Sequence, residues 1–339
     1  MSKLPSSSQL LRRRPRASYI LGALLTALAA ALLVSGATST PTDFDPGKAP
    51  FVVLFGDEVI PYRIFGMPVM PGESYEVSAV APDDRRFVLR ASAGAPERRG
   101  DPGDNRWLWT APADPGLYRL EVVHPVTAEA ITLNMFVMVP LDRAEGGTVN
   151  GYRIGSYPAE PLRGLEVYEP PDGLVEVLPW MEDAHVSPHF RVGQFLCKQA
   201  DGYPKYVVLD ERLPRKLETI LEKLNEEGVD VDGFQVMSGF RTPFYNLAIG
   251  NVKYSIHQWG GAADIFVDEQ PRDGVMDDLN RDGRVDKRDA LFLYQFVNGL
   301  QEEPWFKPML GGLGAYDRTS SHGPFVHVDV RGFLAHWGA

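Results

Sequence analysis

The sequence feature that most constrains the fold is a change of pattern near residue 140. Between Phe51 and about Pro140, short β-rich runs such as "FVVLF", "SYEVSAV" and "LYRLEVV" alternate with clusters of glycine, proline and aspartate. No helical period persists through this stretch, and short strands separated by turn residues are typical of two packed sheets. We therefore expect a β-sandwich over residues 51–140.

After residue 140 the pattern becomes mixed. Residues 141–175 are rich in proline and predict an extended connector. Residues 210–228, "DERLPRKLETILEKLNEEG", carry apolar side chains at positions 213, 217, 220, 221 and 224, which form one face of a helix that ends at a glycine. "FQVMSG", "AADIFVDE" and "PFVHVDVRG" predict strands. A helix combined with a short sheet indicates an α+β domain over residues 176–339.

The N-terminal segment predicts export. Residues 1–17 carry five basic and no acidic residues, and the uncharged apolar run "SYILGALLTALAAALLVSG" follows. Positive charge before such a run keeps its N-terminal side in the cytoplasm. We expect residues 1–37 to be a signal peptide, with a small-residue cleavage site at Ser35–Ala37, or an uncleaved signal anchor in the inner membrane. Residues 38–50 form a polar linker, and the rest of the chain lies in the periplasm or cell envelope.

The charge balance and the cysteine count exclude two classes of protein. The net charge is −11, so the chain beyond the basic N-terminus carries −11 − 5 = −16. Such an acidic body argues against nucleic acid as a partner, because phosphate binding needs a basic surface. The single cysteine, Cys197, excludes an internal disulfide framework.

Two histidines and an aspartate have the spacing of a metal site. "SIHQWGGAADI" places glycines between His257 and Asp264, so that a turn can bring the two together before the apolar strand begins. In "HVDV", His327 and Asp329 are two residues apart and share one face of a strand. Two histidines and one carboxylate leave the fourth position of a tetrahedral zinc site open, which is the catalytic arrangement.

Three motifs carry a resemblance to a known family. "VMSGFRTPFYN", "SIHQWGGAADI" and "GPFVHVDVRG" resemble the zinc peptidases that include D-alanyl-D-alanine carboxypeptidases, vancomycin-resistance dipeptidases and phage L-alanyl-D-glutamate endopeptidases. That family shares a metal-binding core with the hedgehog signalling domain, and the resemblance covers Met181 to Gly338. Its motif S-x-H-x-x-G-x-A-x-D is matched at Ser255, His257, Gly260, Ala262 and Asp264.

The resemblance implies a role for several residues. His257, Asp264 and His327 would bind zinc, which lowers the pKa of bound water from about 15.7 toward about 7. Arg241 would face the substrate and stabilise charge on the oxygen of the scissile carbonyl. A structural ion pair is the alternative role for Arg241.

One position departs from the family pattern. The best-known members carry an acid three residues before the last histidine, where this chain has Pro324. The general base is then Asp329 or His322. We favour Asp329, because strand geometry is expected to aim it at the metal. The alternative for Asp329 is a hydrogen bond that orients a metal ligand.

A second signal, "DLNRDGRVDKRD", lies in a predicted insertion at 273–300 between the metal-ligand motifs. Oxygen-bearing residues at loop positions 1, 3, 5 and 12 and a glycine at position 6 fit a calcium loop and resemble a single dockerin repeat. A charged solvated turn is the alternative. The expected calcium ligands are the side chains of Asp278, Asn280, Asp282 and Asp289 and the backbone carbonyl of Arg284.

The favoured function is zinc-dependent hydrolysis of peptide bonds in peptidoglycan stem peptides or cross-links, by an endopeptidase or carboxypeptidase. The alternative is a cell-wall-binding protein that keeps the metal pocket but lacks a competent base. A cysteine-dependent L,D-transpeptidase is disfavoured, because "FLCKQ" around Cys197 is not a glycine-rich nucleophile motif. "WTAPADPGLYRLEV" resembles part of the immunoglobulin-like modules of bacterial surface proteins, which implies an accessory or spacer role for the sandwich. The sequence does not identify which of these peptide bonds is cleaved.

Overall fold

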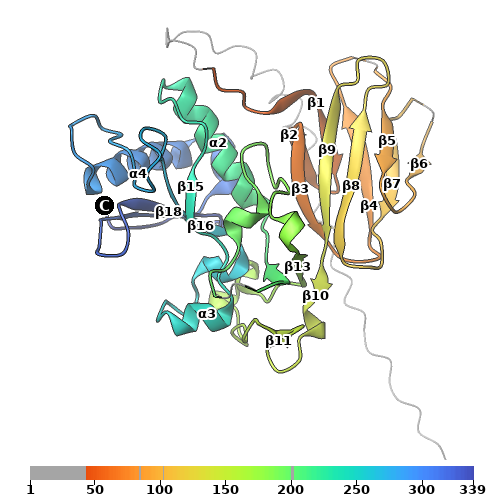
Figure 1. Ribbon diagram of the computed structural model, residues 1–339. Helices are drawn as coiled ribbons and strands as arrows, with labels where there is room; N and C mark the ends of the chain where they lie inside the picture. The colour runs from red at the N-terminus through yellow and green to blue at the C-terminus, as the bar shows by residue number, and fades with distance from the viewer. Residues whose placement is uncertain (1–42, 84, 102, 200–201) are drawn as a thin grey trace, which may run out of the picture. The chain divides into compact units, whose positions relative to one another are not determined.

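The computed structural model describes residues 43–83, 85–101, 103–199 and 202–339. The predicted signal peptide or anchor at residues 1–37 lies outside these ranges, as does most of the predicted linker at 38–50. Within the described ranges, no helix combines the length and the apolar character that crossing a membrane requires. The described chain is a mixed α+β protein with several β-sheets (Figure 1).

The β-rich stretch forms two sheets. The first sheet has the order β2 (Glu58–Tyr62), β1 (Lys48–Phe55), β4 (Ser74–Val80), β7 (Arg106–Thr110) and β6 (Glu97–Arg99). The second has the order β3 (Ile64–Val69), β9 (Ala130–Val137), β8 (Gly116–Val123) and β5 (Val88–Ala91). All strand pairs are antiparallel except β3 with β9.

One apolar core fills the space between these sheets. It takes Val53 and Trp109 from the first sheet and Phe65, Leu120 and Leu133 from the second, and all five are fully buried. Val53, Trp109 and Leu120 alternate with more exposed residues along their strands, as period-two sequences do when one face of a sheet is buried. β3 and β9 are buried over most of their length. The prediction of strands between residues 51 and 140 is confirmed, whereas the immunoglobulin-like character stays a prediction.

The proline-rich stretch after the sandwich differs from the expected extended connector. It contains β10 (Val139–Pro140), the short hairpin β11 (Thr148–Val149) and β12 (Tyr152–Arg153), and three 3-10 turns: η1 (Leu141–Arg143), η2 (Leu162–Gly164) and η3 (Glu166–Tyr168). Tyr168 is 1% exposed. Much of this stretch is therefore packed against the C-terminal region.

The C-terminal region is built around a second five-stranded sheet. Its order is β15 (Gln235–Ser238), β16 (Ala262–Phe266), β18 (Phe325–Asp329), β17 (Gly312–Tyr316) and β19 (Ala335–Trp337). Only β17 and β19 pair in parallel. Two further strands, β13 (Gly173–Val177) and β14 (Lys205–Val207), pair with each other, and β13 also pairs with β10.

Three α-helices lie in the described ranges: α2 (Arg212–Glu226), α3 (Pro243–Ala248) and α4 (Lys287–Glu302). The five apolar residues predicted to form the face of α2 are all at most 1% exposed, which confirms that helix. The remaining 3-10 turns are η4 (Pro179–Met181), η5 (Val192–Phe195), η6 (Ile256–Trp259) and η7 (Pro304–Met309).

Candidate metal centre

Three segments bring the candidate metal ligands together. His257 lies in η6, Asp264 on β16 and His327 on the neighbouring β18, where Asp264 and His327 are directly paired. Gly260 ends η6 with a positive φ of 69°, and a Cβ there would lie 2.1 Å from the carbonyl oxygen of Val208. Only glycine combines this backbone conformation with this close approach, so the turn that delivers His257 depends on it.

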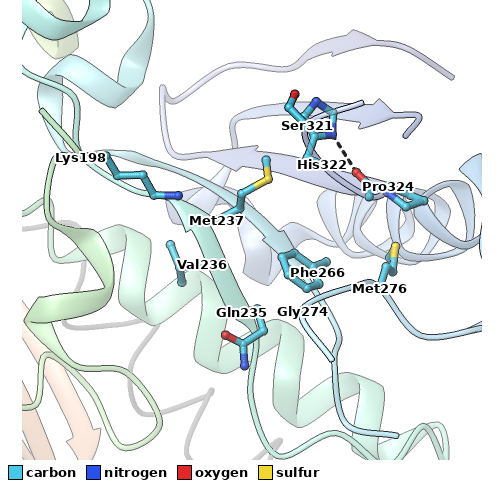
Figure 2. A pocket seen from close by; sticks show the side chains of 11 residues that line it. Lys198, Gln235, Val236, Met237, Phe266, Gly274, Met276, Ser321, His322 and Pro324 are labelled. Atoms are coloured by element: carbon cyan, nitrogen blue, oxygen red, sulfur yellow. Dashed lines mark hydrogen bonds between the residues drawn. The ribbon is translucent and has the colours of Figure 1, made fainter. Parts of the chain in front are cut away.

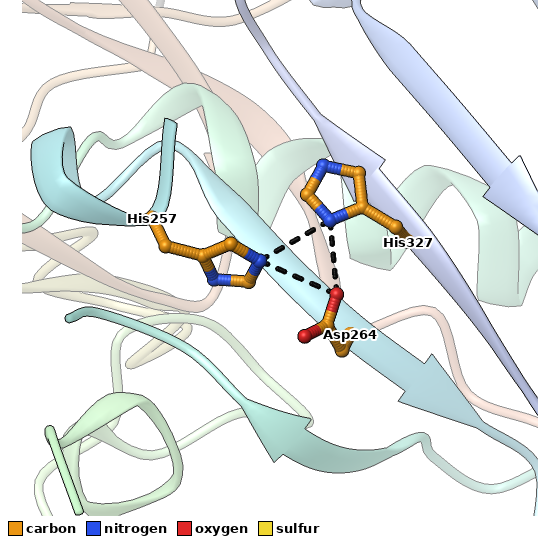
Figure 3. Close-up of side chains that lie close together, drawn as sticks. All are labelled: His257, Asp264 and His327. Carbon is orange, nitrogen blue, oxygen red and sulfur yellow. Dashed lines mark hydrogen bonds and ion pairs between the residues drawn. The ribbon is translucent and has the colours of Figure 1, made fainter. Parts of the chain in front are cut away.

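The three side chains converge on one point (Figure 3). His257 Nε2 lies 3.3 Å from Asp264 Oδ1 and 3.2 Å from His327 Nδ1, and His327 Nδ1 lies 2.9 Å from Asp264 Oδ1. The described residues contain one group of three histidine, cysteine or acidic side chains placed to share a metal ion, and this is that group. All three residues are buried.

The remaining ring nitrogens fix the orientation of both histidines. His257 Nδ1 donates to the carbonyl oxygen of Gly239 at 2.6 Å, and His327 Nε2 donates to Asp329 Oδ2 at 3.1 Å. A ring nitrogen that donates a proton leaves the other nitrogen with a lone pair. In the neutral rings, the lone pairs of His257 Nε2 and His327 Nδ1 would therefore both face Asp264, as ligands of one ion do.

The electrostatics of the cluster favour ionised carboxylates. Burial alone would raise the pKa of Asp264, but the neighbouring His257 and His327 hold it well below the usual range. Burial lowers the pKa of His257, which keeps that ring neutral. Burial acts in the same direction on His327, but hydrogen bonds to Asp264 and Asp329 outweigh it and raise the pKa of His327. Asp264 as an anion and His257 as a neutral imidazole are therefore in the donor forms that a metal requires, whereas a metal bound at His327 would displace the proton that the two carboxylates favour on that ring.

Arg241 lies beside the cluster on the segment after β15. Its guanidinium donates to Asp264 Oδ2 at 2.5 Å, and its Nε donates to Ser238 Oγ at 2.9 Å. The ion pair suggested as its alternative role is therefore present. Arg241 also lines the pocket over the cluster, so the ion pair does not exclude a contact with substrate.

The cluster forms part of the wall of a pocket of about 470 Å³. Besides Arg241, the pocket is lined by the aromatic side chains of Tyr254, Tyr316, Phe325 and Trp337 and by Arg331. Sequence reasoning missed Arg331 and the aromatic residues. The period-two pattern of "PFVHVDVRG" could have placed Phe325 on the face of His327, but Trp337 reaches the site through the parallel pairing of β19, which has no local signal.

The prediction that strand geometry aims Asp329 at the metal is wrong. Asp329 shares the strand face with His327, but its carboxylate bonds to Nε2, the ring nitrogen that faces away from Asp264. It also accepts from the backbone amide of Gly312 at 2.6 Å and from the guanidinium of Arg331. The alternative role, a hydrogen bond that orients a ligand, fits this geometry.

His322 lies in a different pocket from the cluster. Its Nδ1 donates to the carbonyl oxygen of Gly323 at 2.8 Å, and it lines a cavity together with Pro324. The structure therefore brings together His257, Asp264, His327 and Arg241, sets Asp329 behind His327, and separates His322 from the group.

In the predicted calcium loop, carboxylates accept hydrogen bonds from the backbone amides of the loop itself. Asp278 accepts from the amides of Asp282 and Gly283, and Asp289 accepts from those of Asn280 and Asp286. Asp282 also pairs with Arg288 at 2.8 Å. The helix expected after the loop is α4. Calcium binding at Asp278, Asn280, Asp282, Arg284 and Asp289 stays a prediction.

The proline-rich stretch supports the turn that carries His257. Tyr157 donates to the carbonyl oxygen of Gln258 at 2.9 Å, and Trp259 donates to that of Glu169 at 2.8 Å. Tyr168 packs against Trp259 with ring centroids 5.3 Å apart. The stretch predicted as a connector therefore packs against the turn that carries His257.

No protein-family model, curated protein or solved structure matches this chain.

Proposed function

We propose that this protein is a zinc peptidase that hydrolyses amide bonds in the peptides of the bacterial cell wall. The observation that carries the proposal is the convergence of three buried ligand atoms from His257, Asp264 and His327, all within 4.8 Å of one another. Two nitrogen donors and one carboxylate oxygen are a set that zinc accepts, and the adjoining pocket leaves room for a reacting group.

The residues around the cluster suit amide hydrolysis. When bound, zinc supplies Lewis-acid polarisation of a carbonyl and activates water near neutral pH. Arg241 adds a fixed positive charge where negative charge develops on the carbonyl oxygen. Its ion pair with Asp264 also holds the guanidinium at the edge of the ligand group. Asp329, which is paired with Arg331, accepts a hydrogen bond from Nε2 of His327 and so fixes the ring from the side opposite the ligand nitrogen.

The substrate class and the location rest on the sequence. The three ordered motifs resemble peptidases of cell-wall peptides, and the basic and apolar N-terminal segment indicates export to the periplasm or cell envelope. Peptidoglycan stem peptides are present in that compartment, so both arguments lead to the same substrate.

One observation favours a second candidate, a wall-binding protein with little or no activity. Asp264 is the only carboxylate among the described residues that line the pocket, and it serves as a ligand. With Pro324 at the position of the family acid and Asp329 behind His327, the described pocket offers no second carboxylate as a general base. A base typically contributes a factor of about 100 to 10,000 to the rate.

Mass spectrometry of peptidoglycan fragments incubated with the zinc-loaded protein tests the proposal. We expect new peptide fragments from the wild type, and none from His257→Ala, which should also lose bound zinc in elemental analysis. His336→Ala is the matched control, because this exposed histidine of β19 lies outside the ligand group. Stoichiometric zinc without any cleaved fragment would support the wall-binding candidate. Full zinc occupancy in His257→Ala would contradict the metal centre itself.

A further inference from the structure

A second cavity, of about 280 Å³, lies close to the metal pocket. Lys198, from the segment after η5, lies on one side of it, and His322 and Pro324, from the segment before β18, lie on another (Figure 2). Phe266 and Met276 contribute apolar surface. None of these residues belongs to the ligand group.

The two cavities each take one lining residue from the same face of β16. Asp264 and Phe266 are two residues apart on β16, so both point to one face, and Asp264 lines the metal pocket while Phe266 lines the second cavity. Asp264 pairs with His327, and the next pair along is Ile265 with Val326. Continued by one residue, this register sets Phe266 beside Phe325. The ring of Phe325 lies 5.0 Å from that of His322.

The spacing fits one peptide substrate that lies across both cavities. A strand rises about 3.3 Å per residue, so Phe266 lies about 7 Å along the sheet from Asp264. An extended peptide advances about 3.3–3.6 Å per residue. A peptide whose reacting carbonyl is at the ligand group would therefore place a side chain about two residues away in the second cavity.

The polar groups of the second cavity suit a negatively charged side chain. None of the residues that line it is acidic, in a chain whose net charge is −11. Lys198 is exposed and, within the described part of the chain, is not paired with an acidic side chain. The amide of Gln235 adds a hydrogen-bond donor for a carboxylate. His322 donates from Nδ1 to Gly323, so its Nε2 presents a lone pair that can accept from an N–H group of the peptide.

We propose that the second cavity is a substrate subsite in which Lys198 binds a carboxylate of an acidic peptide, about two residues from the bond that is cut. This inference rests on the proposed peptidase function and extends it to substrate selection. It also gives His322 a role in binding the peptide in place of proton transfer at the metal. The ligand chemistry is a peptide carboxylate on an extended chain.

The test compares two peptide probes of the same length and shape, one with free carboxylates and one with uncharged amides at those positions. One is the stem pentapeptide L-alanyl-γ-D-glutamyl-meso-diaminopimelyl-D-alanyl-D-alanine, and the other is the same peptide with the free carboxylates of glutamate and diaminopimelate amidated. Affinity is measured by calorimetry and kcat/KM by chromatography, for the wild type, Lys198→Ala and Lys198→Arg. Lys307→Ala, at an exposed lysine in η7, is the matched control.

We expect the wild type to bind the acidic probe about 5- to 20-fold more tightly than the amidated probe, as for a partly screened charge-assisted hydrogen bond. Lys198→Ala should lose this preference, whereas Lys198→Arg and Lys307→Ala should keep it. An equal preference in wild type and Lys198→Ala would overturn the subsite. If neither probe is cleaved but the preference in binding follows Lys198, the peptidase function fails while the subsite stands.

Discussion

At the scale of single residues, the site depends on which nitrogen of His327 faces the ligand group. Nδ1 faces Asp264 and Nε2 faces Asp329, so the ring lies between two carboxylates with different roles. The sequence predicts that His327 and Asp329 share a strand face. It does not predict the rotation of the imidazole, because that depends on Gly312 and Arg331, which hold the Asp329 carboxylate in place.

Replacing Asp329 with asparagine separates the two roles considered for this residue. An orienting hydrogen bond to a zinc ligand typically contributes a factor of about 10 to 100 in metal affinity. We therefore expect Asp329→Asn to bind zinc about 10- to 100-fold more weakly in competition with a chromophoric chelator. Asp317→Asn, at an exposed carboxylate in the loop after β17, should bind zinc like the wild type. Unchanged zinc affinity with lost activity would instead support Asp329 as the general base.

At the scale of elements, the metal centre depends on contacts between segments far apart in the chain. The helix α2 was predictable because its apolar period is local, and its five face residues are all buried. The two ligand strands were predictable from alternation and from the motif. The supporting role of residues 157–169 was not, because Tyr157 and Trp259 find partners 101 and 90 residues away. A proline-rich stretch without a period carries no signal for such contacts.

Because residues 157–169 pack against η6, we expect a substitution in this stretch, far from the metal ligands in sequence, to destabilise the protein. Tyr168 is 1% exposed and packs on Tyr254 and Trp259. Removing a buried aromatic ring typically costs about 3–5 kcal/mol. We expect Tyr168→Ala to lower the free energy of unfolding by about that amount in urea titrations and to lower zinc affinity as well. Tyr168→Phe keeps the ring and should stay within about 1 kcal/mol of the wild type. Equal stabilities for Tyr168→Ala and wild type would mean that the stretch does not hold the turn.

The loop between β16 and α4 carries the calcium prediction. Calcium modules outside cells often bind with dissociation constants of about 0.1 to 1 mM, and a hundredfold excess over the dissociation constant adds about 2.7 kcal/mol of stability. We expect added calcium to raise the melting temperature of the wild type at fixed zinc. The rise should vanish in the double variant Asp278→Ala with Asp282→Ala. An equal rise in melting temperature in both proteins would indicate that the loop does not bind calcium and is a charged turn, in which Asp282 pairs with Arg288.

At the scale of the whole molecule, one buried charge links the C-terminal elements. Lys216 lies within the apolar face of α2 and is completely buried. Its Nζ donates to the backbone carbonyl of Asp329 on β18 at 2.8 Å and lies 5.5 Å from the ring of Phe306 in η7. The apolar period of α2 predicts burial at this position, but it does not predict that a lysine would fill it, because the partners come from strands and turns much later in the chain.

Burial lowers the pKa of Lys216 from 10.5 to about 8, against the opposing attraction of Asp329. Between pH 8 and 9.5 the folded amine therefore loses its proton while the unfolded amine keeps it. The unfolded state then binds more protons, so the free energy of unfolding rises with pH, by about 1.5 kcal/mol over this interval. We expect urea titrations at pH 8 and 9.5 to show this rise in the wild type and in Lys307→Met, a control at an exposed lysine. Lys216→Met removes the titrating group but keeps an apolar stem of similar length, so it should show no such rise. A rise of the same size in Lys216→Met would assign the proton to another group and would mean that the lysine does not titrate in this range.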